Sequence, residues 1–169
     1  KPLAVMVAGV EEAGRLAEIS AAARSLLASP ERPIVLCPRR SGAALAAEVA
    51  PDGPLLGLFL PYSPLHHLLV AGAGRPLVMT SGNLSEEPIA TRDAEALSRL
   101  AGVADLFLLH DREIENRADD SVARLVAGRP VVMRRSRGWV PRPVALRSRL
   151  RRPVLACGAH LKNVCCLAS

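Results

Sequence analysis

Short apolar runs alternate with stretches of helical spacing along most of the chain. The runs of strand length are residues 3–7, 33–37, 55–60, 76–80 and 106–109. The stretches in which apolar residues recur at helical spacing are 10–27, 42–49, 64–72 and 91–100. Strands that alternate with helices predict an α/β domain whose sheet is at least partly parallel.

Local signals support several of these boundaries. Ser63 suits the N-cap of a helix and Pro64 suits its first position, while Thr91 is expected to cap the last helix. Two further apolar stretches, 121–126 and 130–134, flank a turn with a glycine and predict a hairpin. The hairpin would make the sheet mixed.

The carboxyl-terminal part changes in composition. Residues 141–152 are rich in Pro and Arg, and two apolar stretches of strand length follow. We therefore predict a first domain over 1–145, a linker over 146–152 and the start of a second domain over 153–169.

Composition sets limits on the class of protein. Half of the 169 residues are apolar, but only four are aromatic, so the core must be built from Ala, Val and Leu. No apolar run reaches the 18 residues typical of a membrane-spanning helix, and the first residues do not have the pattern of a signal peptide. No membrane association is expected.

The four cysteines favour a reducing compartment. Cys37, Cys157, Cys165 and Cys166 include no C-x-x-C pair, and three of them lie in apolar runs of strand length. A cytoplasmic protein without disulfides is the expectation.

The end of the run 76–80 is the most informative place for chemistry. Ser81, Gly82 and Asn83 follow this strand directly. In open α/β sheets ligands bind beyond the carboxyl ends of strands, where Ser and Asn can donate to phosphate or acyl oxygens and Gly admits close approach. From the residues alone, a plain turn remains the alternative.

The segment T-S-G-N-L-S-E-E-P-I at 80–89 resembles the S-x-N segment of the YrdC family, whose members make carbamoyl-adenylate or threonylcarbamoyl-adenylate. Other stretches that fit the family in order are 1–6, 29–36, 119–122 and 133–138. The resemblance covers roughly residues 1–145. It implies an α/β fold with a YrdC-like open twisted mixed sheet and flanking helices. In this family a K-x-R motif that contacts the nucleotide lies just before the position of Lys1, so the resemblance implies a domain truncated at its N-terminal side.

Within that family, one branch fits best. Residues 60–69 resemble the L-P-Y-T-P-L-H-H-L-L of HypF-type carbamoyltransferases, and Phe59 stands where the tRNA-modifying branch tends to carry Arg. The sequences R-R-S-R-G-W-V-P and L-K-N also look HypF-like. The L-K-N at 161–163 falls where the actin-like, TsaD-related ATPase domain of such enzymes should begin, so the chain is expected to be part of a longer enzyme.

The resemblance implies an ATP-dependent carbamoyltransferase. Such an enzyme uses carbamoyl phosphate and ATP to form carbamoyl-adenylate. It is expected to transfer the carbamoyl group to the C-terminal Cys of a HypE-type acceptor protein, for the cyanide ligands of [NiFe] hydrogenase. ATP is the implied cofactor, Mg²⁺ is expected with it, and any zinc or iron site is expected outside this chain. Small-molecule hydroxyls are the alternative acceptors.

Site residues follow from matched positions. The residues expected to act in catalysis are Ser81, Asn83 and Arg134. The residues expected to bind the nucleotide are these three together with Lys1, Arg32, Arg117, Ser121 and Lys162. No metal ligands are expected: the adjacent His66 and His67 would point about 100° apart on a helix and cannot share one ion without distortion.

Two other functions remain open. One is a threonylcarbamoyl-adenylate synthase of the YrdC/TsaC type, which performs the same chemistry with threonine added. The other is a module for double-stranded RNA or other nucleic acid, because residues 134–152 hold eight arginines and no acid in a chain of net charge +6. With so few aromatics for base stacking, nucleic acid is not the expected partner.

Overall fold

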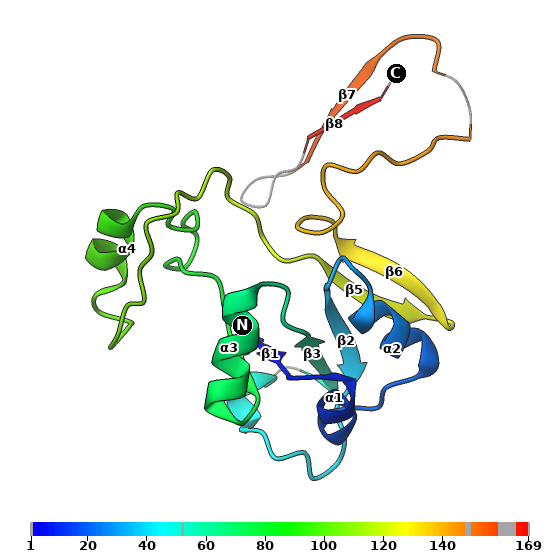
Figure 1. Ribbon diagram of the computed structural model, residues 1–169. Coiled ribbons are helices and arrows are strands. Elements are labelled where there is room, and N and C mark those ends of the chain that lie inside the picture. Colours follow the sequence, from blue (N-terminus) through cyan, green and yellow to red (C-terminus); the bar gives the residue numbers. More distant parts are fainter. Residues whose placement is uncertain (1, 52, 148–149, 159–164, 169) are drawn as a thin grey trace. The chain divides into compact units, whose positions relative to one another are not determined.

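The computed structural model describes residues 2–51, 53–147, 150–158 and 165–168 (Figure 1). The chain divides into two compact units. The first unit is Lys1–Thr80 with Asp119–Val140, and the second is Ser81–Ala118 with Pro141–Ser169. Each unit is described by itself below.

A six-stranded mixed sheet forms the first unit. Its strands are β1 (Ala4–Met6), β2 (Ile34–Pro38), β3 (Leu55–Phe59), β4 (Leu77–Met79), β5 (Val122–Val126) and β6 (Arg129–Arg134), in the spatial order β4-β1-β3-β2-β5-β6. The pairs β1–β3 and β2–β5 are parallel, and the other three are antiparallel. The α/β mixed sheet and the hairpin after residue 120 are therefore confirmed.

Helices cover both faces of this sheet. The helices α1 (Val10–Leu16) and α2 (Ala21–Ala28) contribute to the larger core cluster, which includes Val5, Val35 and Leu58. The helix α3 (Pro64–Ala73) places Val70 against Met6 and Phe59. Because successive strand residues face opposite ways, neighbours such as Val5 and Met6 enter different clusters. Aliphatic side chains dominate the larger cluster, as the composition predicts, whereas the buried residues of the smaller one are Met6, Phe59 and Val70.

The ends of α3 follow the predicted signals. The Ser63 side chain accepts a hydrogen bond from the His66 backbone N–H at 3.2 Å, and Pro64 is the first helical residue. Gly74 ends the helix in the left-handed conformation with φ of 61°, which glycine adopts without the cost of a Cβ. These caps orient Tyr62, just before the helix, toward the contacts described in the next subsection.

The single helix predicted over 10–27 is two helices. The chain leaves α1 at Ala17, which bridges to Arg39, and the Glu18 backbone N–H donates to the Pro38 carbonyl oxygen at 2.8 Å. Ser20 then caps α2 by accepting from the Ala23 N–H. Pairing with the end of β2 therefore replaces helical hydrogen bonds that the apolar spacing alone predicts.

The helix predicted over 42–49 is also wrong. Only a short 3₁₀ turn, Ala47–Val49, is present. Gly42 has φ of 75°, which is not helical, and the Arg39 guanidinium donates to the Leu45 carbonyl oxygen at 2.6 Å. The backbone around Gly42 therefore does not form a helix. The Ala-rich composition indicates helix propensity, but these backbone contacts override it.

In the second unit, the helix α4 (Asp93–Leu100) starts after Arg92 instead of at a Thr91 cap. The strand predicted at 106–109 pairs with no strand in the described part of the chain, and Leu106 and Leu108 are 90% and 71% exposed. An apolar run becomes a strand only when a neighbouring strand accepts its backbone hydrogen bonds, and this run lacks that partner here.

The two carboxyl-terminal strands form a hairpin. The strands are β7 (Val154–Cys157) and β8 (Cys165–Ala168), and they pair antiparallel in a sheet of their own. Every residue of β7 is exposed. The two strands predicted in this segment are confirmed, while the domain boundaries at 145 and 152 remain predictions. Across the described ranges, every helix is too short or too polar to cross a membrane.

Deleting residues 153–169 should leave the melting temperature of the first unit nearly unchanged. The hairpin has an exposed β7 and forms a separate sheet, so its removal takes little buried apolar surface with it. Thermal unfolding followed by circular dichroism tests this, and light scattering should show less self-association because an exposed strand pair is removed. A large drop in melting temperature would contradict the boundary that we place before residue 153.

Candidate functional site

The S-G-N segment forms a closed loop in the second unit. The Ser81 hydroxyl donates to the Asn83 side-chain oxygen at 2.5 Å, and the Asn83 amide nitrogen donates to the carbonyl oxygens of Leu84 and Glu87 at 2.7 and 3.0 Å. The Ala90 N–H donates to the Gly82 carbonyl oxygen at 3.0 Å. The Asn83 side chain therefore stabilises this loop through its hydrogen bonds and fixes the orientation of the Ser81 hydroxyl.

Ion pairs and a backbone contact connect α4 and Arg117 to the same loop. Arg99 on α4 pairs with Glu87 and with Glu95. Arg117 donates through its Nε to the Ile89 carbonyl oxygen at 2.7 Å. The predicted nucleotide ligand Arg117 therefore lies within this unit together with Ser81 and Asn83, and its hydrogen bond connects residue 117 to the loop at residue 89.

Ser121 is a buried junction in the first unit. It has no exposed surface, its hydroxyl donates to the Arg137 carbonyl oxygen at 2.8 Å, and it accepts from the Ser136 N–H at 2.8 Å. The Ser121 carbonyl oxygen also accepts from the Ile34 N–H. The residue therefore joins β2 to the loop after β6. Its predicted contact with a nucleotide remains untested, and all three hydrogen bonds described here are to backbone groups.

Arg134 ends β6 beside this junction. Its Nε donates to the Asp120 backbone carbonyl oxygen at 2.7 Å, and its side chain is partly exposed. That bond orients the guanidinium, and within the described residues its terminal nitrogens are left for another partner. A guanidinium in this state is suited to bind phosphate oxygens through two parallel hydrogen bonds.

Arg137 makes several side-chain contacts in this region, although the sequence did not single it out. Its Nε donates to a carboxylate oxygen of Asp120 at 2.8 Å, and its terminal nitrogens donate to the carbonyl oxygens of Glu31 and Arg32 at 3.3 and 2.8 Å. The guanidinium carbon also lies 3.3 Å from the centre of the Tyr62 ring. Such stacking is favourable because the ring face is electron-rich.

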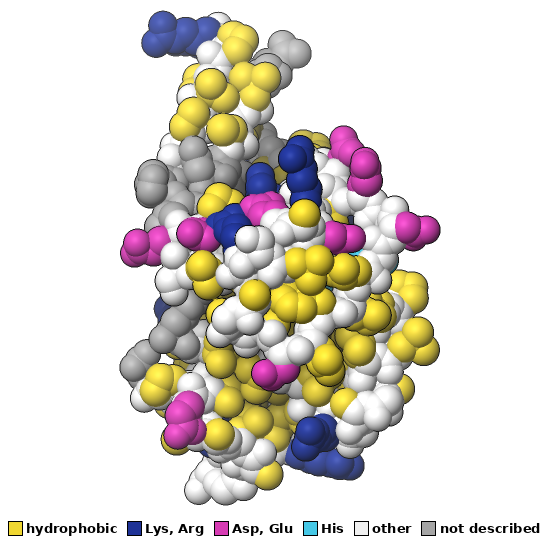
Figure 2. All heavy atoms as spheres, turned by 90° about the vertical axis from the view of Figure 1, so that its left-hand side faces the viewer, with side chains coloured by type: hydrophobic (Ala, Val, Ile, Leu, Met, Phe, Trp, Pro, Cys, Tyr) yellow, Lys and Arg dark blue, Asp and Glu magenta, His cyan; other side chains and the backbone are white. Residues whose placement is uncertain are grey.

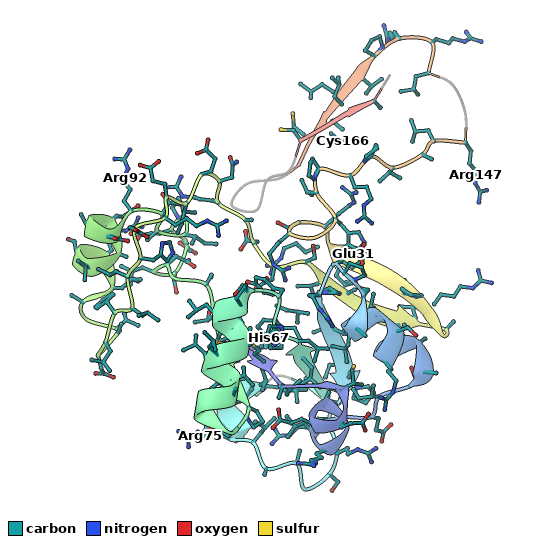
Figure 3. All side chains as sticks on the ribbon, in the orientation of Figure 1. Glu31, His67, Arg75, Arg92, Arg147 and Cys166 are labelled. Atoms are coloured by element: carbon teal, nitrogen blue, oxygen red, sulfur yellow. The ribbon has the colours of Figure 1, made fainter. Side chains whose placement is uncertain are left out.

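The chain comes very close to itself at this point. Gly138 has φ of 90°, and a Cβ built there would lie 2.8 Å from the Glu31 Cα, closer than real side chains approach. A residue with a side chain would force the two segments apart. Glu31 lies at the end of α2 nearest this loop (Figure 3). Arg32, a predicted nucleotide ligand, takes part through its carbonyl oxygen, while its own side chain donates to the Leu27 carbonyl oxygen.

Tyr62 and His66 form the aromatic side of the same cluster. Their rings meet edge to face with centroids 4.5 Å apart, and the His66 Nδ1 atom is buried with no hydrogen-bond partner in the described chain. Burial lowers the pKa of His66, Asp120 opposes this shift, and the charges of Arg137 and His67 add to it. His66 is therefore held neutral beside an arginine, while His67 is exposed. The two histidines do not converge on one point.

The predicted site residues thus fall into two groups. Ser81, Asn83 and Arg117 belong to the second unit, and Arg32, Ser121 and Arg134 belong to the first. Their convergence on one cleft remains a prediction. Lys1 and Lys162 lie outside the described residues. Among the described side chains, no three potential metal ligands come together.

A separate cavity lies beside the start of α2 and the strand β2 in the first unit. It has a volume of about 700 Å³, and its lining includes Ala23, Cys37, Arg40 and Arg124 but none of the predicted site residues. Burial raises the pKa of the Cys37 thiol to about 11, so this cysteine behaves as a core residue. The candidate site is therefore the hydrogen-bonded region around Arg134 and Arg137, since none of the predicted site residues lines the cavity.

The fold and these contacts define a YrdC-like α/β domain. A solved structure of full-length HypF in the phosphate- and nucleotide-bound form superposes with a TM-score of 0.91 and 45% identity, over 99% of this chain and 26% of that one. The P. abyssi Sua5 complexed with L-threonine superposes with a TM-score of 0.67 over 80% of this chain and 40% of that one; at 19% identity it supports the fold alone.

Sequence comparison places the chain in one family. The Sua5/YciO/YrdC family model, described as "Telomere recombination", matches residues 1–136, so the chain belongs to that family. Carbamoyltransferase HypF of Synechocystis sp. is 41% identical over 168 residues, and the probable carbamoyltransferase HypF of Methanocaldococcus jannaschii is 38% identical over 168 residues. Each match covers 99% of this chain but 22% of the relative, so the chain spans about a fifth of those proteins.

Replacing Ser121 by alanine should destabilise the protein by about 1–3 kcal/mol, because it leaves the Ser136 N–H and the Arg137 carbonyl oxygen buried without a partner. Urea unfolding measures the loss. Ser25→Ala is the matched control: its hydroxyl donates to the Ala21 carbonyl oxygen at an exposed position of α2, so its removal should cost less than about 0.5 kcal/mol. Equal losses in the two variants would show that the junction does not depend on Ser121.

His66 should make the protein less stable at acid pH. Its folded-state pKa lies below the usual 6.5, so the unfolded chain binds more protons as the pH falls below about 6.5, and the free energy of unfolding decreases there. Unfolding at pH values of about 7.5 and 5 should show that His66→Gln loses less stability on acidification than the unsubstituted protein. His67→Gln, at an exposed position, should change the pH response much less than His66→Gln, because it removes only the smallest contribution to the lowered pKa of His66. Identical pH responses in both variants would contradict this assignment.

Proposed function

We propose that this chain is the adenylate-forming part of a HypF-type carbamoyltransferase. In this proposal carbamoyl phosphate is hydrolysed to carbamate and phosphate, and a carbamate oxygen attacks the α-phosphorus of ATP, so that pyrophosphate leaves. The carbamoyl group then passes from the adenylate to an acceptor thiol, with AMP as the leaving group, and we propose that this thiol is the C-terminal Cys of a HypE-type protein. The protein would be cytoplasmic and would contribute to hydrogenase maturation.

The observation that carries the proposal is the similarity to HypF proteins over nearly the whole chain. It reaches 38–45% identity with coverage of 99%. The Sua5 structure with L-threonine is only 19% identical over 80% of the chain, so the threonine-using branch is less well supported. One of the similar HypF proteins was solved in a phosphate- and nucleotide-bound form, and such ligands agree in chemistry with an arginine whose terminal nitrogens are available at the end of β6.

Such a reaction depends on positioning and on charge neutralisation, since no covalent nucleophile is needed. We assign Arg134 to the phosphates of ATP, because one backbone contact orients it and its terminal nitrogens make no other hydrogen bond or ion pair in the described chain. Ser81 would donate to the ligand only after its hydroxyl turns away from the Asn83 side-chain oxygen, to which it donates in this structure, and Asn83 would hold that loop in shape. Mg²⁺ would accompany ATP, with its remaining ligands supplied by phosphates and water.

The arginine-rich stretch 134–152 suggests nucleic-acid binding only if its arginines act alike. Their surroundings differ: Arg134 bonds to the backbone beside a buried serine, whereas Arg147 extends from an exposed segment of the second unit (Figure 3). This difference favours a specific anion site in the first unit over a uniform basic surface.

In a full-length carbamoyltransferase that contains this sequence, Arg134→Ala should reduce adenylation by about a hundredfold, the scale expected for one strong contact to a developing charge. Arg147→Ala should change it by less than about threefold, since a single exposed charge contributes little. ATP–pyrophosphate exchange that depends on carbamoyl phosphate is the measurement. Equal losses would instead favour general basicity and a nucleic-acid partner, which a salt-dependent gel shift would then reveal.

A further inference from the structure

Two arginines, one at the end of β6 and one in the loop after it, contact the same aspartate in different ways. Arg137 contacts the Asp120 carboxylate with its Nε at 2.8 Å, while Arg134 contacts the Asp120 backbone carbonyl oxygen with its Nε at 2.7 Å. The carboxylate therefore stays with Arg137, although Arg134 is bonded to the same residue. The Asp120 carboxylate therefore neutralises the charge of Arg137 and not that of Arg134.

The geometry keeps Asp120 on the side of Arg137. The guanidinium of Arg137 is fixed from three further directions, by the carbonyl oxygens of Glu31 and Arg32 and by the face of Tyr62. Both members of the ion pair are largely buried: the side chains of Arg137 and Asp120 are 20% and 28% exposed. A pair held in this way is less screened by solvent than a surface pair.

The groups that face Asp120 come from several elements. Arg137 bonds to it from the loop after β6, the Tyr62 side chain lies against it from the segment before α3, and His66 on α3 is close enough for its charge to matter. Arg134 reaches the backbone of the same residue. Among these neighbours, Arg134 is the other permanent cation, so it is the partner that a released Asp120 carboxylate would find.

We propose that Arg137 is a positioning residue that holds the Asp120 carboxylate away from Arg134 and thereby keeps the Arg134 guanidinium free for an anionic phosphate ligand. This rests on the proposed function for the identity of the ligand, but it concerns a different residue and a different property. Without Arg137, the Asp120 carboxylate turns to Arg134 and competes with phosphate for it.

The proposal predicts a rescue that a purely structural role does not. In the full-length enzyme, Arg137→Ala should weaken AMP binding and raise the KM for ATP by about tenfold, a difference of about 1.4 kcal/mol. Adding Asp120→Asn removes the competing charge, so the double variant should recover to within about threefold of the unsubstituted enzyme. Its melting temperature should stay as low as that of Arg137→Ala, because the contacts with Glu31, Arg32 and Tyr62 are still missing.

Two further variants complete the design. Arg137→Lys keeps a positive charge beside Asp120 but loses the planar fork, so it should retain most of the affinity for AMP while losing thermal stability. Arg129→Ala is the matched control, since Arg129 is an exposed arginine at the other end of β6. It should alter neither AMP affinity nor melting temperature appreciably.

Calorimetric titration with AMP and ATP–pyrophosphate exchange separate the two hypotheses. If AMP binds and the double variant is rescued but no carbamoyl-phosphate-dependent exchange occurs, the proposed function is wrong and the role of Arg137 stands. If affinity and melting temperature fall together in Arg137→Ala and neither recovers in the double variant, Arg137 has only a structural role. If the unsubstituted enzyme binds no AMP, Arg134 is not a nucleotide ligand and both are overturned.

Discussion

The loop after β6 depends on one buried hydrogen-bonding group, the Ser121 hydroxyl. A hydroxyl with no access to water must find partners within the protein, and this one finds the N–H of residue 136 and the carbonyl oxygen of residue 137. Those two bonds fix the position of the backbone at Ser136 and Arg137. The direction of its side chain, and with it the contacts to Asp120, Tyr62 and the end of α2, follows from that attachment.

The strands and the site differ in how far the sequence predicts them. Runs such as 33–37 and 55–60 are apolar, short and bounded by Pro or Gly, so their strands were predicted within one or two residues. The break at Ala17 was missed because it depends on a bridge to Arg39, and the run at 106–109 was wrongly predicted because strand formation depends on a partner. Local pattern contains no information about either pairing.

The contacts of Arg137 also could not be predicted from the local sequence pattern. Its sequence neighbours suggest only one more arginine in a basic stretch, yet its hydrogen bonds reach residues 105 and 106 positions away. The one available signal was Gly138, whose positive φ and close approach to Glu31 require a glycine after the arginine. Ser121 and Arg134 were named from family resemblance, but neither the buried state of one nor the single contact of the other follows from the sequence.

Several apolar side chains are exposed on α3, the helix that begins next to Tyr62. Figure 2 shows one face on which hydrophobic side chains lie open among separated charges. On α3, Leu65, Leu68 and Leu69 are 43%, 71% and 40% exposed, although the same helix begins at the Tyr62–His66 cluster. Isolated exposed leucines are ordinary, but three on one ten-residue helix leave little of it packed. Its attachment to the sheet therefore relies on Val70, the one buried residue of α3, which packs against Met6 and Phe59.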